Sequence, residues 1–338
     1  MRKVSLIVLC MACAIVGAFV SANAAQYVIR DLGPLDGHVY GAAYAINESG
    51  QIAGRSGSHI VLWEVNGAPK DYCIIPEGST GDPLAIDKSG HIVGRLLNER
   101  TGVEQAVTCS GDGFAKELGS FGGRIGEACG INDNGWIVGF SAEKSGSEKA
   151  FLWQKEAGLI QLAMIKGARR SAAYDINSSA QIAGYCGNSA VIWSKDGKVK
   201  DLGTLKGTIR SIAWGINGKG VTCGEAVDEE GNRHAWVCKP GAGMTELELL
   251  PGWSEASARK INDSGIVVGW VRNQSKSPVE GDAKYRAVAW DESGKVIDLG
   301  VLPKGTLSQA MGVNNAGVIV GRATAPDGKS HAVAWVIK

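Results

Sequence analysis

The sequence has little proline and no regular helical pattern. It contains 9 prolines and 48 glycines in 338 residues, a balance that favours many tight turns over disorder. Apolar residues do not recur at helical spacing, which argues against helical and α/β folds. After Val20 there is no apolar run long enough for a spanning helix. We therefore expect a turn-rich, all-β chain.

The chain also lacks an excess of either charge. Without Arg2 and Lys3, the 35 basic residues fall to 33, against 34 acidic ones. A nucleic-acid-binding protein needs a basic footprint, so this balance argues against nucleic acid as a partner.

The N-terminus has the pattern of a secretory signal peptide. Arg2 and Lys3 precede the apolar stretch Val4–Val20, and Ala22-Asn23-Ala24 follows it. Small residues at these positions predict cleavage after Ala24. We expect a signal peptide at 1–24 and a single domain at 25–338, secreted to the extracellular space or the periplasm. An uncleaved membrane anchor is the alternative.

Motifs that carry catalysis or bind metals are missing. There is no H-E-x-x-H, no paired Cys/His spacing and no G-x-S-x-G. Asp133-Asn134-Gly135 resembles the start of a calcium loop, but the full pattern with its distal Glu is absent. We therefore name no catalytic residue, no metal ligand and no cofactor.

Six cysteines remain after signal removal, at irregular spacings and without C-x-x-C. They are Cys73, Cys109, Cys129, Cys186, Cys223 and Cys238. Six cysteines allow 15 pairings, and the sequence does not choose among them. Cys223 occupies a small apolar position of the repeat described below, which favours core packing. A bond from Cys223 to Cys238 is the alternative for that residue.

One phrase, Ile-Asn-x-x-Gly-x-Ile-x-Gly, returns seven times with small variations. Its Asn or Asp stands at Asn47, Asp87, Asn132, Asn177, Asn217, Asn262 and Asn314. A small residue, or Pro in one copy, lies four positions earlier in every case. Asn-x-x-Gly predicts a hairpin turn, because Asn bonds the following backbone and Gly tolerates φ > 0.

Two further phrases complete the repeat. An apolar run ending in Trp follows most copies: Trp63, Trp153, Trp193, Trp290 and Trp335. An Asp-Leu-Gly segment or a relative of it comes next. Four short strands in about 40–45 residues are the size of one propeller blade. We expect these tryptophans to pack between blades.

Gly-Ile-Asn-Asp-Asn-Gly-Trp-Ile-Val-Gly (130–139) and Lys-Ala-Phe-Leu-Trp (149–153) resemble the HAF repeat of extracellular bacterial proteins. His234-Ala235-Trp236 and His331-Ala332-Val333 match its His-Ala-Phe element best. The resemblance covers essentially residues 26–338. It implies export and repetition rather than a particular reaction.

The repeat predicts a closed ring. The mature chain begins with a lone fourth strand at 27–32 and ends with a blade that lacks one. If the first strand completes the last blade, no open edge remains. We therefore predict an all-β, seven-bladed β-propeller of four-stranded antiparallel blades. An open β-solenoid or a sandwich array is the alternative.

Two functions fit these features. The first is a binding or scaffold module for an extracellular polysaccharide or protein, with its ligand on the face that carries the loops after the second and fourth strands. The position after the second-strand glycine supplies the candidate ligand-binding residues: Arg55, Arg95, Phe140, Tyr185, Glu225, Trp270 and Arg322. Guanidinium groups pair with carboxylates and aromatic rings stack on sugars, so an acidic ligand is expected.

The second function is a carbohydrate-active enzyme, a lyase or glycosidase, with a site at the mouth of the ring. Such an enzyme needs carboxylates or a histidine at a usable distance. Glu225 with Asp175 is the one pair that we nominate for that role.

Overall fold

The computed structural model describes residues 27–64, 67–111, 113–273 and 285–338. The expected signal peptide and most of the loop from Val271 to Tyr285 lie outside these residues. All regular structure in the described ranges is β-strand, and none of it is a helix that could cross a membrane.

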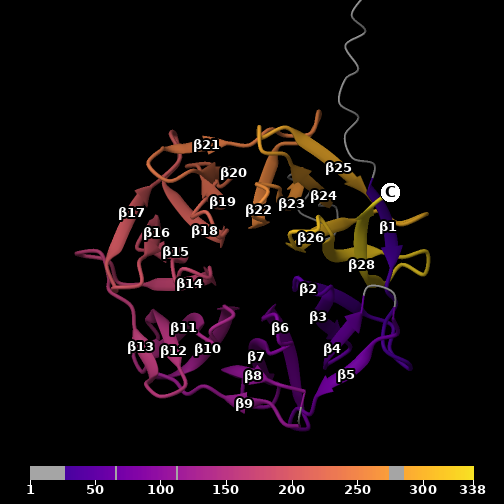
Figure 1. Cartoon of the computed structure of the whole chain (residues 1–338), viewed down its shortest axis with the longest axis horizontal. Coiled ribbons are helices and arrows are strands. Elements are labelled where there is room, and N and C mark those ends of the chain that lie inside the picture. The colour runs from indigo at the N-terminus through magenta and orange to yellow at the C-terminus, as the bar shows by residue number, and fades with distance from the viewer. Residues whose placement is uncertain (1–26, 65–66, 112, 274–284) are drawn as a thin grey trace, which may run out of the picture.

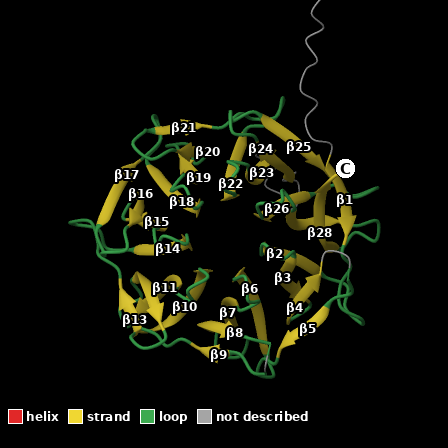
Figure 2. Cartoon of the chain, in the orientation of Figure 1, coloured by secondary structure: helices red, strands yellow, loops and turns green. Residues whose placement is uncertain are grey.

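Seven four-stranded antiparallel sheets stand around a central axis (Figures 1 and 2), which confirms the predicted seven-bladed propeller. The strands nearest the axis are β2 (Gly41–Ile46), β6 (Ser79–Ile86), β10 (Gly122–Ile131), β14 (Ser171–Ile176), β18 (Arg210–Ile216), β22 (Glu255–Ile261) and β26 (Ser308–Val313). Their hairpin partners are β3 (Gln51–Ser56), β7 (Ile92–Asn98), β11 (Ile137–Glu143), β15 (Ile182–Cys186), β19 (Thr222–Val227), β23 (Val267–Arg272) and β27 (Ile319–Thr324).

The outer half of each blade follows the same order. The third strands are β4 (His59–Glu64), β8 (Val103–Cys109), β12 (Glu148–Gln154), β16 (Ser189–Trp193), β20 (Arg233–Cys238), β24 (Tyr285–Trp290) and β28 (Ser330–Ile337). The outermost are β5 (Lys70–Cys73), β9 (Lys116–Glu117), β13 (Gly158–Gln161), β17 (Val199–Gly203), β21 (Met244–Glu246), β25 (Val296–Gly300) and β1 (Tyr27–Asp31).

The two ends of the chain close the ring as predicted. β1 pairs antiparallel with β28, from Tyr27 opposite Ile337 to Asp31 opposite Val333. The N-terminal strand thereby becomes the outermost strand of the last blade (Figure 1). With β1 in place, all seven blades have four strands, and the third strand of the last blade is not left as an open edge.

Large aromatic side chains fill the spaces between blades. Trp63, Trp193, Trp290 and Trp335 are fully buried, as expected. The indole N–H of Trp193 donates to the carbonyl of Ala163, which follows the outermost strand of the preceding blade. Four of the five predicted interblade tryptophans are thus confirmed.

Trp153 departs from this pattern. Its side chain is only partly buried, and the fully buried aromatic of its blade is Phe151, two residues earlier. A Cβ built on Gly139 would lie 2.8 Å from the Phe151 ring, and one on Gly54 would lie 2.7 Å from Trp63. The ring over the second-strand glycine can therefore come from either of two positions on the third strand. Trp153 still packs against the apolar cluster between its blade and the preceding one, as expected, but only partly buried, because Phe151 occupies the fully buried space.

The repeated Asn side chains link each hairpin turn to the next blade. Oδ1 of Asn217 accepts hydrogen bonds from the backbone N–H groups of Lys219 and Val221, which holds its own turn. Nδ2 of Asn217 donates to the backbone carbonyl of Asn262 in the next blade. The same interblade bond starts from Asn47, Asn132, Asn177, Asn262 and Asn314. Only the Asp87 copy, which has no side-chain N–H, interrupts this circle of bonds.

One disulfide joins two neighbouring blades. Cys73 on β5 is bonded to Cys109 on β8, across 36 residues of sequence. Cys109 stands where other blades carry Trp, so the bond crosslinks a blade that has no buried Trp at that place. Cys223 and Cys238 are both free and buried, so the alternative bond between them was wrong. Cys223 is fully buried in an apolar cluster, as core packing predicted.

Candidate ligand-binding site in the central channel

Every innermost strand carries a β-bulge at the same repeat position. In β22 the register shifts between Ala258 and Lys260, and Arg259 is the extra residue. The other six strands shift at the equivalent place. A bulge puts one unpaired residue into a strand and redirects its side chain. Here it directs one side chain per blade toward the axis of the ring.

A glycine on the second strand makes each bulge possible. A Cβ built on Gly224 would lie 1.9 Å from the carbonyl oxygen of Ile212, and one on Gly269 would lie 2.0 Å from that of Ser257. The five equivalent glycines show the same clash, at 1.9 to 2.2 Å. The last glycine of the repeated phrase is therefore required by the close approach of the bulged strand.

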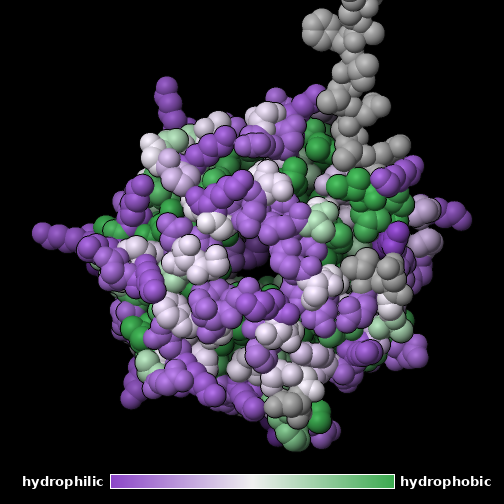
Figure 3. Space-filling view, in the orientation of Figure 1, coloured by the Kyte–Doolittle hydropathy of each residue, from purple (hydrophilic) through white to green (hydrophobic). Residues whose placement is uncertain are grey.

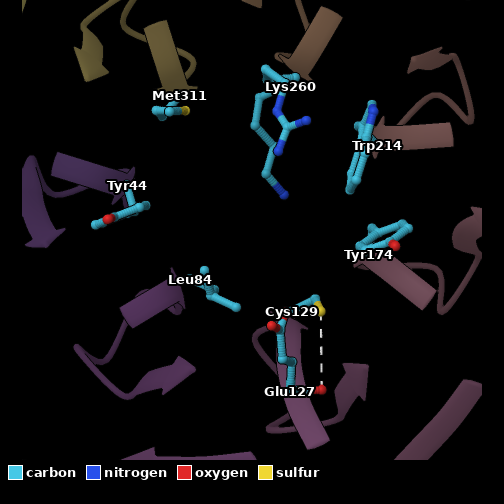
Figure 4. A pocket seen from close by; sticks show the side chains of 9 residues that line it. Tyr44, Leu84, Glu127, Cys129, Tyr174, Trp214, Lys260 and Met311 are labelled. Atoms are coloured by element: carbon cyan, nitrogen blue, oxygen red, sulfur yellow. Dashed lines mark hydrogen bonds between the residues drawn. The ribbon is translucent and has the colours of Figure 1, made fainter. Parts of the chain in front are cut away.

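The bulged residues line a cavity of about 130 Å³ on the axis of the ring. Figure 4 shows their side chains converging from separate blades, and Figure 3 shows the surface hollowed at the centre of the ring among mostly hydrophilic residues. The seven bulged residues are Tyr44, Leu84, Cys129, Tyr174, Trp214, Arg259 and Met311, and Glu127 and Lys260 complete the lining.

Most charged groups at the cavity are already paired. Lys260 binds Asp175 of another blade at 2.7 Å. Glu127 binds Arg95 at 2.9 Å. Burial raises the pKa of Glu127, and Arg95 opposes this rise. These pairs neutralise the cavity wall except at Arg259.

Three aromatic groups adjoin on one side of the cavity. The rings of Tyr174 and Trp214 are 4.1 Å apart between centroids, and Tyr185 stacks on Tyr174 at 6.1 Å. Burial raises the pKa of the Tyr44 and Tyr174 hydroxyls well above the usual value, so both stay protonated and can donate hydrogen bonds. The cavity thus combines aromatic faces with neutral donors.

The seven residues that the sequence nominated lie one strand behind this cavity. Each is opposite an innermost-strand residue at the same register, as Arg55 is opposite Ala42. The same level of the ring carries Arg95, Phe140, Tyr185, Glu225, Trp270 and Arg322. We call these seven residues the outer ring.

Both arginines at the start of the outer ring are bound to carboxylates. Asp82 accepts from Arg55 at 2.7 Å and from Arg95 at 3.0 Å. Arg95 also pairs with Glu104 and Glu127. A guanidinium surrounded by three carboxylates is a structural link between strands and blades, which leaves it less capacity for a ligand.

The other members of the outer ring also have partners. Phe140 and Trp270 are buried, and the Trp270 ring meets the Tyr285 ring at 5.2 Å. Tyr185 donates its hydroxyl to Glu148 at 3.0 Å. Nε of Arg322 donates to Gln309 at 2.7 Å. Their role in binding stays a prediction.

The nominated enzyme pair, Glu225 and Asp175, belongs to two separate ion pairs. Glu225 on β19 is buried and binds Arg233 at 3.3 Å. Asp175 on β14 binds Lys260 and also accepts the N–H of Ile216 at 2.9 Å. Each carboxylate is thus held by a different partner, and Glu127 is the carboxyl that lines the cavity.

The opposite mouth of the channel, at the hairpin turns, contains a second cavity of about 340 Å³. Its polar groups mainly bond one another. Asp263 accepts the N–H of Gly218 and Glu48 accepts that of Asn315, each from another blade. This mouth is therefore part of the bonding between blades.

Sequence reasoning missed the bulged residues. The signal was present, because the position three before each Asn or Asp varies from Tyr to Arg, whereas the position before it is Ala in six copies and Pro in one. A position that varies inside an otherwise regular repeat indicates a side chain that the blade structure does not require. Without the bulge, strand alternation alone does not show that this side chain faces the axis.

No family model matches this chain, and no curated protein does. Solved structures resemble it in fold. A streptogramin B lyase is 10% identical with a TM-score of 0.58, covering 93% of this chain and 100% of its own. A virginiamycin B lyase from Staphylococcus aureus is 10% identical with a TM-score of 0.52, covering 92% of this chain and 100% of its own. TolB from Acinetobacter baumannii is 11% identical with a TM-score of 0.52, covering 88% of this chain and 67% of its own. At such identities these likenesses show the fold alone.

Proposed function

We propose that this protein is an exported HAF-repeat binding module that takes its ligand on the axis of the ring. The observation that carries the proposal is the circle of seven bulged residues, which differ in kind although the frame around them repeats. Side chains that only supported the ring would repeat with it, as the Asn residues do. A varied wall on a rigid frame is typical of a binding site.

The expected ligand is an acidic extracellular polysaccharide or protein that approaches from the loop face named from the sequence. Lys166 and Arg169, which form no ion pair with any described residue, lie in a loop on that face beside a cavity of about 470 Å³. They would attract an acidic polymer. The channel cavity, at about 130 Å³, has room for one terminal group of such a ligand.

A blocking variant tests the axial site. Leu84 is partly buried and lines the cavity without a hydrogen bond, so Leu84→Trp should fill the space and leave the ion pairs intact. Leu249→Trp makes the same change at an exposed residue and is the matched control. Both proteins are screened on an array of extracellular polysaccharides and acidic proteins.

Loss of the wild-type ligand in Leu84→Trp but not in Leu249→Trp supports an axial site. Loss only after Arg322→Ala moves the site to the outer ring. Binding that neither change affects refutes both placements. The alternative function, a carbohydrate-active enzyme, predicts shorter chains after incubation, and that activity should disappear in Glu127→Gln.

A further inference from the structure

Arg259 has no counter-ion among the residues that the structure describes. It lies on β22 with its guanidinium carbon 4.0 Å from the centre of the Trp214 ring. In the described ranges it makes neither a hydrogen bond nor an ion pair. Glu225, the carboxylate whose charge acts on it most strongly, is bound to Arg233. Burial lowers the pKa of Arg259, which shows that its charge is poorly solvated. The Arg259 side chain is only partly buried, but a partly buried cation without a counter-ion adds little to the stability of a fold, so its presence points to a role beyond folding.

A second unused donor lies beside it. The indole Nε1 of Trp214 is buried and has no hydrogen-bond partner. Trp63 and Trp290, in contrast, donate to backbone carbonyls at 3.1 and 2.7 Å. Trp236 and Trp335 also lack partners, but both are fully buried in closed core, whereas Trp214 lines the channel cavity. A ligand in that cavity meets the Trp214 ring directly, and it reaches the buried N–H only if the side chain shifts.

The remaining charges of the cavity do not satisfy these donors. Its other cation, Lys260, is held by Asp175, and its carboxyl, Glu127, is held by Arg95. The cavity wall therefore presents one surplus positive charge together with hydrogen-bond donors. That chemistry selects an anion that accepts several bonds, and a carboxylate matches a guanidinium edge.

The aromatic neighbours indicate what carries the carboxylate. The guanidinium of Arg259 lies over the Trp214 ring, which is next to the Tyr174 ring. Tyr44 lines the same cavity from another blade (Figure 4). Aromatic faces pack against the apolar faces of sugar rings. The carboxylates of Asp and Glu side chains are on short open chains without such a ring, so the combination favours an acidic sugar over an acidic peptide segment.

We propose that the channel cavity binds the uronic acid residue of an acidic polysaccharide, with Arg259 and the Trp214 N–H on its carboxylate and Tyr174 beside its ring. This inference rests on the proposed function and names its ligand class. It assigns to Arg259 a role that the stability of the propeller does not require.

Two substitutions separate binding from folding. Arg259→Gln removes the charge, and Trp214→Phe keeps an aromatic ring but removes the N–H. Arg100→Gln, at an exposed loop residue, changes net charge equally and is the control. Binding of galacturonate oligomers, neutral galactose oligomers and poly-glutamate is measured by calorimetry on the mature chain, with thermal unfolding recorded in parallel.

We expect the wild type to bind galacturonate oligomers and not galactose oligomers. Arg259→Gln should weaken binding at least tenfold, and Trp214→Phe severalfold, while Arg100→Gln changes nothing. Because Arg259 is a partly buried cation without a counter-ion among the described residues, Arg259→Gln should melt at or above the wild-type temperature. A residue with a structural role would instead lower that temperature.

Four results overturn the inference. They are absence of uronate binding, equal binding of neutral oligomers, preference for poly-glutamate, and uronate binding that Arg259→Gln leaves unchanged. In each case the blocking variant Leu84→Trp still tests the axial site with any ligand found on the array. Failure of this inference is thus distinct from failure of the proposed function.

Discussion

Replacing Asn217 with Ala should destabilise the ring by about 3 kcal/mol. The Asn217 side chain is buried and makes three hydrogen bonds: from the N–H groups of Lys219 and Val221, and to the carbonyl of Asn262. Each is worth about 1 kcal/mol net, and a buried partner left without a bond costs about 1–3 kcal/mol. The loss falls on one hairpin turn and one blade interface together.

The measurement is equilibrium urea unfolding of the mature, oxidised chain. Asn217→Asp keeps the two acceptor bonds but loses the donor, so it should cost less than Asn217→Ala. Asp87 provides the reverse control in a His91→Ala background, which removes the ring nitrogen that lies 3.0 Å from Oδ2 of Asp87. There, Asp87→Asn would restore the missing donor and should stabilise the ring by up to about 1 kcal/mol. If Asn217→Ala changed the free energy of unfolding by less than about 0.5 kcal/mol, the reasoning on the circle of Asn bonds would be refuted.

Further predictions concern closure, packing and pH. Deleting residues 25–33 removes β1 and its five register pairs with β28, so the melting temperature should fall sharply; an unchanged melting curve would contradict closure. Trp193→Ala should cost about 3–5 kcal/mol, and Trp153→Ala clearly less because Trp153 is only partly buried; equal losses in urea unfolding would contradict the assigned burial. Burial opposes the charge of His234, but hydrogen bonds to Asp228 and Glu246 raise its pKa overall. Protonated His234 should therefore stabilise the fold fully below about pH 6.5, the pKa of a free histidine. This stabilisation should be lost as the pH rises through the higher pKa of His234 in the folded state. His234→Gln should abolish that dependence, and an unaltered pH profile of unfolding would count against it.

The Asn-x-x-Gly turns, the four-strand unit and the closure of the ring were all predictable from the sequence. Each depends on a pattern within one repeat or on a count of strands. Ala180 shows that residues close in sequence are enough to determine such a turn. It stands at the turn glycine position with φ 59° and donates its N–H to Asn177, as the glycines do at their turns. Neighbouring residues determine such a turn, so the sequence is sufficient to predict it.

Contacts between blades were not predictable in the same way. The Cys73–Cys109 bond and the replacement of Trp153 by Phe151 depend on how adjacent sheets meet. The bond from Asn314 to Asn47 joins residues 267 apart. The repeat predicts that adjacent blades contact each other, but it does not predict which side chains meet. Several side chains at equivalent repeat positions could make such a contact, and only the packing of the blades decides among them.

The candidate site shows most clearly which features the sequence predicts and which depend on the tertiary structure. The sequence drew attention to the outer ring, whose Arg55 and Arg95 are bound to Asp82. The residues on the axis depend on one extra residue in each innermost strand, which changes the direction of a side chain that simple alternation would misplace. Only the assembled ring brings Arg259 over Trp214 and leaves it without a carboxylate. The sequence by itself determined the repeating frame, whose bonds are mostly local, and the tertiary structure decided the site, whose contacts join different blades.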